Sequence, residues 1–102
     1  MNIEINTNYY KALNKRNASY IFEKYAEDIK VGENYLNMKN FIQLNFTSNL
    51  PNNKPIVSKY TLVDLDTKET YIDNLTIYEY NIDKIKKCGT MKARKNINLL
   101  QP

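Results

Sequence analysis

Strict alternation of apolar and polar residues in two short stretches constrains the fold of this 102-residue chain more than any other feature. In residues 2–6, Ile3 and Ile5 alternate with polar residues. In residues 41–47, one side carries Ile42, Leu44 and Phe46, and the other carries Gln43, Asn45 and Thr47. A two-residue period is that of a β-strand whose two faces meet different surroundings. Both stretches are therefore predicted to be half-buried strands.

A helical period separates these two strands. Apolar residues recur at steps of three and four between residues 11 and 31, and the stripe that they form consists of Ala18, Ile21, Phe22, Tyr25 and Ile29. This spacing is typical of an amphipathic helix with one side against a core. Gly32 suits the position just past a helix end. The stretch from 11 to 31 is therefore predicted to be one long helix.

The second half of the chain carries the pattern of a β-hairpin. A loop rich in proline and asparagine occupies residues 48–55, and β-branched and aromatic residues dominate 56–63 and 70–82. The polar stretch 64–69 between them predicts a long turn. Together these patterns predict a single α+β domain, with a small mixed sheet, one long helix, a β-hairpin and a short basic C-terminal segment.

Positive charge is concentrated at the C-terminal end. The net charge is +4, yet residues 1–83 carry nine basic and eleven acidic side chains, whereas residues 84–102 carry six basic and no acidic ones. The six are Lys84, Lys86, Lys87, Lys92, Arg94 and Lys95. Such a cluster can neutralise phosphates, so it is a candidate for binding nucleic acid or a partner; the alternative is a solvated tail. Asp83 is expected to cap a short helix over 83–88, and residues 89–102 to form a loosely ordered basic tail.

Composition excludes several classes of site. The chain has no histidine and one cysteine, Cys88. This rules out a Cys/His zinc site, a Ser-His-Asp triad, a Cys–His dyad and an internal disulfide. The sequence shows no signal peptide and no apolar run near the length of a membrane span, so a cytoplasmic location is expected. Asn, Lys, Ile and Tyr make up nearly half of the chain, which indicates an A/T-rich coding sequence rather than a function.

An ordered series of segments runs through the chain. It comprises the strand around Glu4, Asn8-Tyr9-Tyr10, the helix with Arg16 and Tyr20, Gly32-Glu33-Asn34-Tyr35, Ile42-Gln43-Leu44-Asn45, Asp73-Asn74-Leu75 and Ile77-Tyr78-Glu79. In order and spacing these segments resemble the PD-(D/E)XK nuclease family transposases, the group that includes the Rpn recombination-promoting nucleases. The resemblance covers roughly residues 2–87 and implies a PD-(D/E)XK-like core over residues 1–88.

The resemblance also implies an incomplete catalytic site. In that family the strand motif is E-x-K or E-x-Q, and an aspartate on the preceding strand completes the metal site. Glu4 and Asn6 stand at the motif positions here, but Asn6 is a shorter amide, and Met1 stands only three residues before Glu4. The core is therefore expected to lack its first half, with Glu4 and Asn6 as vestigial catalytic residues. No metal or other cofactor is expected, and Mg²⁺ only if a complete site is assembled in trans.

Three functions follow from this interpretation. The first is a catalytically incomplete nuclease- or transposase-like domain that serves a mobile element as a binding or interaction protein; enzyme activity is left open at this point, with its absence favoured because the metal site is incomplete. The alternative is a small phage or mobile-element inhibitor of a host defence complex, similar to an anti-CRISPR. The third is an active nuclease whose site forms across a dimer.

The missing preceding strand also bears on partners. Without it, residues 2–6 present an unpaired edge, and proteins normally cover such edges. A homodimer or partner complex is therefore expected to cover this region. Nucleic acid or a ribonucleoprotein is the other candidate partner, and no membrane is expected to be one.

Overall fold

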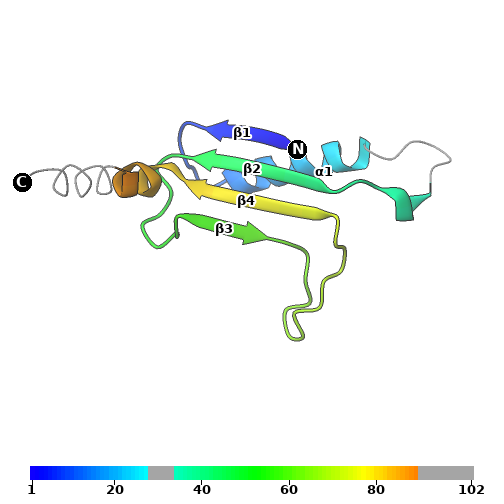
Figure 1. The fold of residues 1–102 in the computed structure, drawn as a ribbon. Coiled ribbons are helices and arrows are strands. Elements are labelled where there is room, and N and C mark those ends of the chain that lie inside the picture. Colours follow the sequence, from blue (N-terminus) through cyan, green and yellow to red (C-terminus); the bar gives the residue numbers. More distant parts are fainter. Residues whose placement is uncertain (28–33, 90–102) are drawn as a thin grey trace, which may run out of the picture.

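The computed structural model describes residues 1–27 and 34–89 (Figure 1). Its elements are β1 (Asn2–Asn6), α1 (Leu13–Glu27), the 3-10 turn η1 (Tyr35–Asn37), β2 (Phe41–Thr47), β3 (Val57–Tyr60) and β4 (Leu75–Asn81). Residues 82–89 follow as a second helix. The described chain is an α+β fold with two helices and an open four-stranded mixed sheet, which confirms the predicted class. Ile29 and Gly32, predicted at the helix end, lie outside the described residues.

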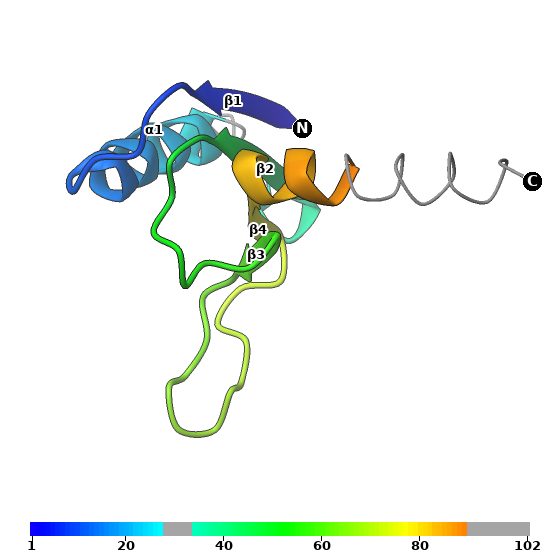
Figure 2. The same ribbon diagram turned by 90° about the vertical axis from the view of Figure 1, so that its left-hand side faces the viewer.

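The strands lie in the order β1-β2-β4-β3. β1 runs parallel to β2, β2 runs parallel to β4, and β3 lies antiparallel to β4 at the other edge. Parallel neighbours need a crossover connection. α1 lies in the connection between β1 and β2 and covers one face of the sheet (Figure 2). β1 is thus an edge strand, as the sequence analysis expected.

β3 and β4 form the predicted hairpin, but their strands are shorter than the sequence indicated. Pairing between them ends at Tyr60, which lies opposite Ile77. The connection then leaves the sheet as a long loop with an isolated bridge between Val63 and Thr70 (Figure 2). Every residue from 61 to 70 is exposed. The β-branched side chains of this loop therefore pack against no buried surface that would stabilise a strand there.

Apart from Phe41, Leu75 and Ile77, the face of the sheet that α1 covers is polar. In β2, Gln43 and Asn45 are buried, whereas their apolar neighbours are partly exposed. On β1, Ile3 and Ile5 point away from α1 and are 59% and 70% exposed. The two strands are half-buried as predicted, but the buried side is the opposite of the one that their apolar residues indicate.

The apolar core is small and lies between α1 and the sheet. Its buried cluster is Ile21, Phe41 and Leu75, against which Tyr25, Ile72 and Ile77 pack. The Tyr25 and Phe41 rings meet edge to face with their centroids 6.1 Å apart. Phe22, predicted in the same helical stripe, is 48% exposed. It points outward because α1 buries a narrower face that contains Leu13 and Asn17.

Candidate functional site

Three rows of side chains cross the sheet on the face that α1 covers. Because β1, β2 and β4 are parallel, each row takes one residue from each strand. The first row is Asn2, Gln43 and Ile77; the second is Glu4, Asn45 and Glu79; the third is Asn6, Thr47 and Asn81. All of them except Ile77 are polar. This polar layer is where the fold gathers the side chains that are able to bind or react.

Glu4 and Asn6, the residues expected at vestigial catalytic positions, both belong to the polar layer. Asn6 is buried, and its Nδ2 donates a hydrogen bond of 3.1 Å to Thr47 Oγ1. Glu4 is partly exposed and borders a shallow depression beside Tyr20 and Lys24. The Asn6 amide is therefore engaged in joining β1 to β2, while Glu4 remains accessible.

Asn45 separates the two carboxylates of the second row. Neighbouring strands lie about 4.8 Å apart, so the backbones that carry Glu4 and Glu79 are about 10 Å from each other. Within residues 1–27 and 34–89, no three His, Cys, Asp or Glu side chains form a group that could hold a metal ion. In the second row, the Asn45 amide lies between the carboxylates of Glu4 and Glu79.

A cavity of about 220 Å³ lies between α1 and the polar layer. Its wall consists of Asn14, Asn17, Ala18, Ile21, Asn45, Tyr60, Ile77 and Glu79. Asn17 and Glu79 are only 6% and 4% exposed. Asn17 Nδ2 and Glu79 Oε1 find no hydrogen-bond partner among the residues that the structure describes. Because buried polar atoms are nearly always paired, these two atoms make the cavity a candidate binding site.

Gln43 lies next to Asn45 on the same strand face. Its Nε2 donates to Asn45 Oδ1 at 3.0 Å, which holds the Asn45 amide in place. Its Oε1 is a further buried atom with no partner within the described part of the chain. The sequence marked Gln43 and Asn45 only as a polar strand face, and the position of α1 makes that face interior.

In the sequence analysis Glu79 appeared only within the segment Ile77-Tyr78-Glu79 and was not selected as a site residue. Its burial could have been predicted from the alternation of β4, because Glu79 lies on the same strand face as the apolar residues Leu75 and Ile77. Burial raises the pKa of the Glu79 carboxyl, and the nearby Lys54 ammonium opposes that rise more weakly. A carboxyl in these surroundings holds its proton to higher pH than an exposed one.

Lys54 contacts the rim of the same cavity through Tyr60. Its Nζ donates to the Tyr60 hydroxyl at 3.2 Å and lies 5.9 Å from the centre of the ring. The hydrogen bond to Tyr60 is the main cause that raises the pKa of Lys54. The cavity therefore has a buried acid inside and a positive charge near its wall.

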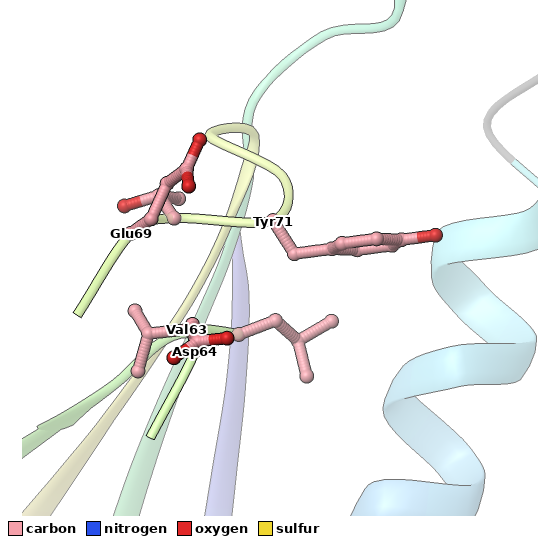
Figure 3. A pocket seen from close by; sticks show the side chains of 6 residues that line it. Val63, Asp64, Glu69 and Tyr71 are labelled. Carbon is pink, nitrogen blue, oxygen red and sulfur yellow. The ribbon is translucent and has the colours of Figure 1, made fainter. Parts of the chain in front are cut away.

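A second hollow lies in the loop between β3 and β4 (Figure 3). Its lining residues are Leu62, Val63, Asp64, Glu69, Thr70 and Tyr71. The backbone N–H groups of Thr67 and Asp66 each donate to Asp64 Oδ1 at 2.9 Å and lower the pKa of the Asp64 carboxyl. Asp64 and Glu69 come from opposite limbs of the loop and are exposed (Figure 3). Asp64 therefore stabilises the turn, which is a common use of aspartate in loops.

The second helix begins one residue earlier than predicted, so its cap differs. Asn81 Oδ1 accepts a hydrogen bond of 3.2 Å from the backbone N–H of Lys84, which makes Asn81 the N-cap. The prediction that Asp83 caps this helix was wrong. Asp83 lies inside the first turn, and its Oδ2 accepts from the backbone N–H of Asn49 at 2.8 Å. The acid therefore holds the loop after β2 against the helix.

The structure describes three of the six basic residues predicted to bind nucleic acid or a partner. Lys84 is partly buried, and its Nζ donates to the carbonyl oxygens of Asn52, at 3.0 Å, and Lys54. Lys84 therefore stabilises the loop between β2 and β3. Lys86 and Lys87 are exposed on the helix of residues 82–89. The other three, which lie outside the described residues, are Lys92, Arg94 and Lys95.

The face of the sheet opposite α1, here called the open face, is apolar. By strand register it carries Ile3, Ile5, Ile42, Leu44, Phe46, Val57, Lys59, Thr76, Tyr78 and Tyr80. Figure 1 looks onto this face, with α1 behind the sheet, and no described helix or loop crosses it. Its side chains in β1 are mostly exposed, and those in the central strands are partly exposed. The open face is therefore an apolar surface that the described fold leaves without a covering layer.

Aromatic rings line part of the open face. Phe46 and Tyr80 stack with centroids 4.8 Å apart and planes 12° from parallel, and Tyr78 lies 6.5 Å from Tyr80. Lys59 Nζ lies 5.9 Å from the centre of the Tyr78 ring. Lys59 carries the one formal charge of this face, at the β3 edge.

Comparison with known proteins finds no family model, no curated protein and no solved structure that matches this chain. Within the described residues, no helix is both long enough and apolar enough to cross a membrane.

Proposed function

We propose that this chain is a non-catalytic interaction domain of a mobile element, and that it works as a homodimer joined through the open face. The observation that carries the proposal is the reversed polarity of the sheet, which leaves isoleucine, leucine and aromatic side chains uncovered. Apolar patches of several hundred Å² on a protein surface mark interaction sites. The function that the geometry supports best is therefore binding rather than turnover.

The size of the open face favours a reversible dimer. Two strands of seven residues, one of five and one of four, spaced about 4.8 Å apart with a rise of about 3.3 Å per residue, give a plan area of about 360 Å². Counted as plan area alone, two such faces remove about 700 Å² from water, which is below the ~1,200–2,000 Å² of stable specific complexes and in the range of weak, transient ones. Apolar burial contributes about 25 cal/mol per Å² before the cost of association. Dimerisation is therefore expected to depend on concentration in the micromolar range.

Charge favours a second copy as the occupant. The open face bears one charged side chain, Lys59, at its β3 edge, so two identical faces meet with little repulsion. A symmetric dimer requires such a self-complementary patch. β1 adds an unpaired backbone edge next to Ile3 and Ile5, which is a second feature of the same region that proteins normally cover.

Nucleic acid fits this face less well. Base stacking needs a free ring face, and phosphates need several basic groups nearby. Phe46 and Tyr80 already stack on each other, and Lys59 is the one basic residue among the face's positions. A protein surface is therefore the better match for the open face.

The nuclease-like ancestry is part of the same proposal. Glu4 on an edge strand, the α1 crossover and the later β3–β4 hairpin support it. The engagement of Asn6 with Thr47 and the 10 Å scale of the Glu4–Glu79 spacing support a role without catalysis. We place the protein in the cytoplasm, in keeping with its exposed, unpaired Cys88.

The substitution Ile5→Lys tests the dimer. Ile5 is 70% exposed, so lysine there places a charge on the open face without disturbing the core. Light scattering from low to high micromolar concentration should show dimerisation of the native chain and at least about tenfold weaker association of Ile5→Lys. Leu65→Lys is the matched control, because Leu65 is 81% exposed in the β3–β4 loop and its substitution should leave the dimer intact.

Two results would overturn the homodimer. One is a native chain that stays monomeric at high micromolar concentration, and the other is Ile5→Lys associating as strongly as the native chain. Retention of an oligonucleotide that is lost in Lys59→Ala would instead identify nucleic acid as the occupant. Capture of a purified defence ribonucleoprotein that is lost in Ile5→Lys would support the inhibitor alternative.

A further inference from the structure

The cavity beneath α1 lies on the other side of the sheet from the open face, so the proposed dimer does not use it. Its wall brings together residues from four elements: Asn17 from α1, Asn45 from β2, Tyr60 from β3 and Glu79 from β4. None of these was selected as a site residue from the sequence. Their convergence is a product of the fold.

Two atoms in the wall lack partners and have opposite hydrogen-bonding roles. Asn17 Nδ2 is a donor and Glu79 Oε1 serves as an acceptor, and both are buried without a partner in the described part of the chain. A side-chain amide nitrogen donates only, and a carboxyl oxygen that carries no proton accepts only. A ligand that satisfies both must carry a donor and an acceptor.

The rest of the wall specifies shape and polarity. Ala18, Ile21 and Ile77 supply apolar surface, and Tyr60 supplies an aromatic ring. The volume of 220 Å³ equals the share of about seven water molecules. This suits one small ring system and is too small for a drug-sized molecule or a nucleotide.

We propose that this cavity binds a small planar heteroaromatic amine through its amidine edge. The exocyclic amino group donates to Glu79 Oε1, and the adjacent ring nitrogen accepts from Asn17 Nδ2. The ring plane contacts Ile21, Ile77 and the Tyr60 side chain. The ligand thus supplies the partners that both buried atoms lack.

Other small occupants satisfy fewer of these groups. A metal cation would engage Glu79 and leave the Asn17 donor unpaired, and an anion would accept from Asn17 and leave Glu79 Oε1 without a donor. Water satisfies both polar atoms but gains nothing from the apolar wall. A flat ring with a polar edge uses both parts of the wall, as small-molecule sites commonly require.

9-Methyladenine and 9-methylpurine, called adenine and purine below, provide a direct test, because they share a ring system without an N–H group and differ only in the exocyclic amino group. Adenine, added to the native chain at millimolar concentration, should cause saturable changes in the backbone amide NMR signals of residues 14–21 and 77–79. Purine should bind about tenfold more weakly, since it lacks the donor for Glu79 Oε1. Equal binding of the two compounds, or saturable binding of neither, would overturn the proposal.

The variant Asn17→Asp tests the other contact. It exchanges the amide donor for a carboxylate oxygen, so adenine binding should fall at least about tenfold. Asn37→Asp is the matched control, because Asn37 is exposed in η1 outside the cavity, and it should bind adenine as the native chain does. Unchanged adenine binding in Asn17→Asp would refute the assigned geometry.

If Asn17→Asp does not fold, the proposal can still be tested on the native chain. In that case the contrast between adenine and purine still decides, together with a crystal soaked in adenine. Ring density against Ile21 and Glu79 supports the proposal. Ordered water alone in the soaked cavity would show that solvent is the natural partner of Asn17 and Glu79, and the proposal would fall.

Discussion

The two faces of this sheet differ in polarity, and the polar face is mostly the one that the helix covers, which is the reverse of the usual arrangement. A sheet with one covered face normally buries its apolar residues and presents its polar residues to water. Here the covered face holds Gln43, Asn45 and Glu79, and the open face holds Ile3 and Ile5. Covering by a helix and apolar composition are thus separate properties of a sheet face. The polar face is then held by hydrogen bonds such as that from Asn6 Nδ2 to Thr47 Oγ1, whereas the described fold leaves the apolar face uncovered.

The largest expected contrast between the faces is in core packing. Ile21→Ala removes a residue that is 1% exposed in the α1 core, and it should lower the free energy of unfolding by about 2–5 kcal/mol. Ile5→Ala, on the open face, should change the stability of the monomer by no more than about 0.5 kcal/mol. Urea unfolding at low protein concentration measures both. Equal losses would mean that the open face is packed in the monomer, and the contrast would be broken.

A smaller effect is expected within the polar layer. Asn6→Ala deletes the donor to Thr47 Oγ1 and should lower the free energy of unfolding by about 1–3 kcal/mol, because a buried hydroxyl loses its partner. Asn2→Ala, at the partly exposed start of the same strand, should cost less than half as much. Chemical denaturation of the two variants gives the comparison. If Asn6→Ala were neutral, Asn6 would be released for a role other than joining the strands.

The smallest effect concerns the proton on Glu79. Its folded-state pKa is raised above the ordinary value of 4.5, so the folded chain binds this proton more tightly than the unfolded chain does. Stability from this group is therefore full below pH 4.5 and is lost as pH rises through the folded pKa. Glu79→Gln should remove this dependence and raise the free energy of unfolding at neutral pH, by less than the loss in Asn6→Ala.

Thermal unfolding of the native chain and of Glu79→Gln, measured from pH 4 to 8, gives the pH dependence of stability for each. The matched control is Glu69→Gln in the exposed β3–β4 loop, which should leave the pH dependence as it is in the native chain. A Glu79→Gln variant with the native pH dependence would show that Glu79 is effectively solvated, and the covered face would then be more open than its burial indicates.

The candidate sites show what register adds to a strand pattern. Sequence analysis placed Glu4 and Asn6 on one strand face, and the structure keeps them there. Sequence analysis could not place Glu4 beside Asn45, or Asn45 beside Glu79. These three residues become neighbours only because β1, β2 and β4 pair in parallel. Asn17 could not be linked to them either, since its place opposite the cavity depends on how α1 crosses the sheet.

The sequence by itself determined the elements, because their periods are local. Alternation placed the strands at 2–6 and 41–47, three- and four-residue steps placed α1, and the polar stretch at 64–69 placed the long turn of the hairpin. Tertiary structure alone decided which face of the sheet is covered. Alternation separates two faces but does not say which one a crossover helix covers, since that depends on the side of β2 on which β1 pairs. That choice made Glu79 interior and Ile5 exterior, because each side chain takes its surroundings from strands and helices distant in the sequence.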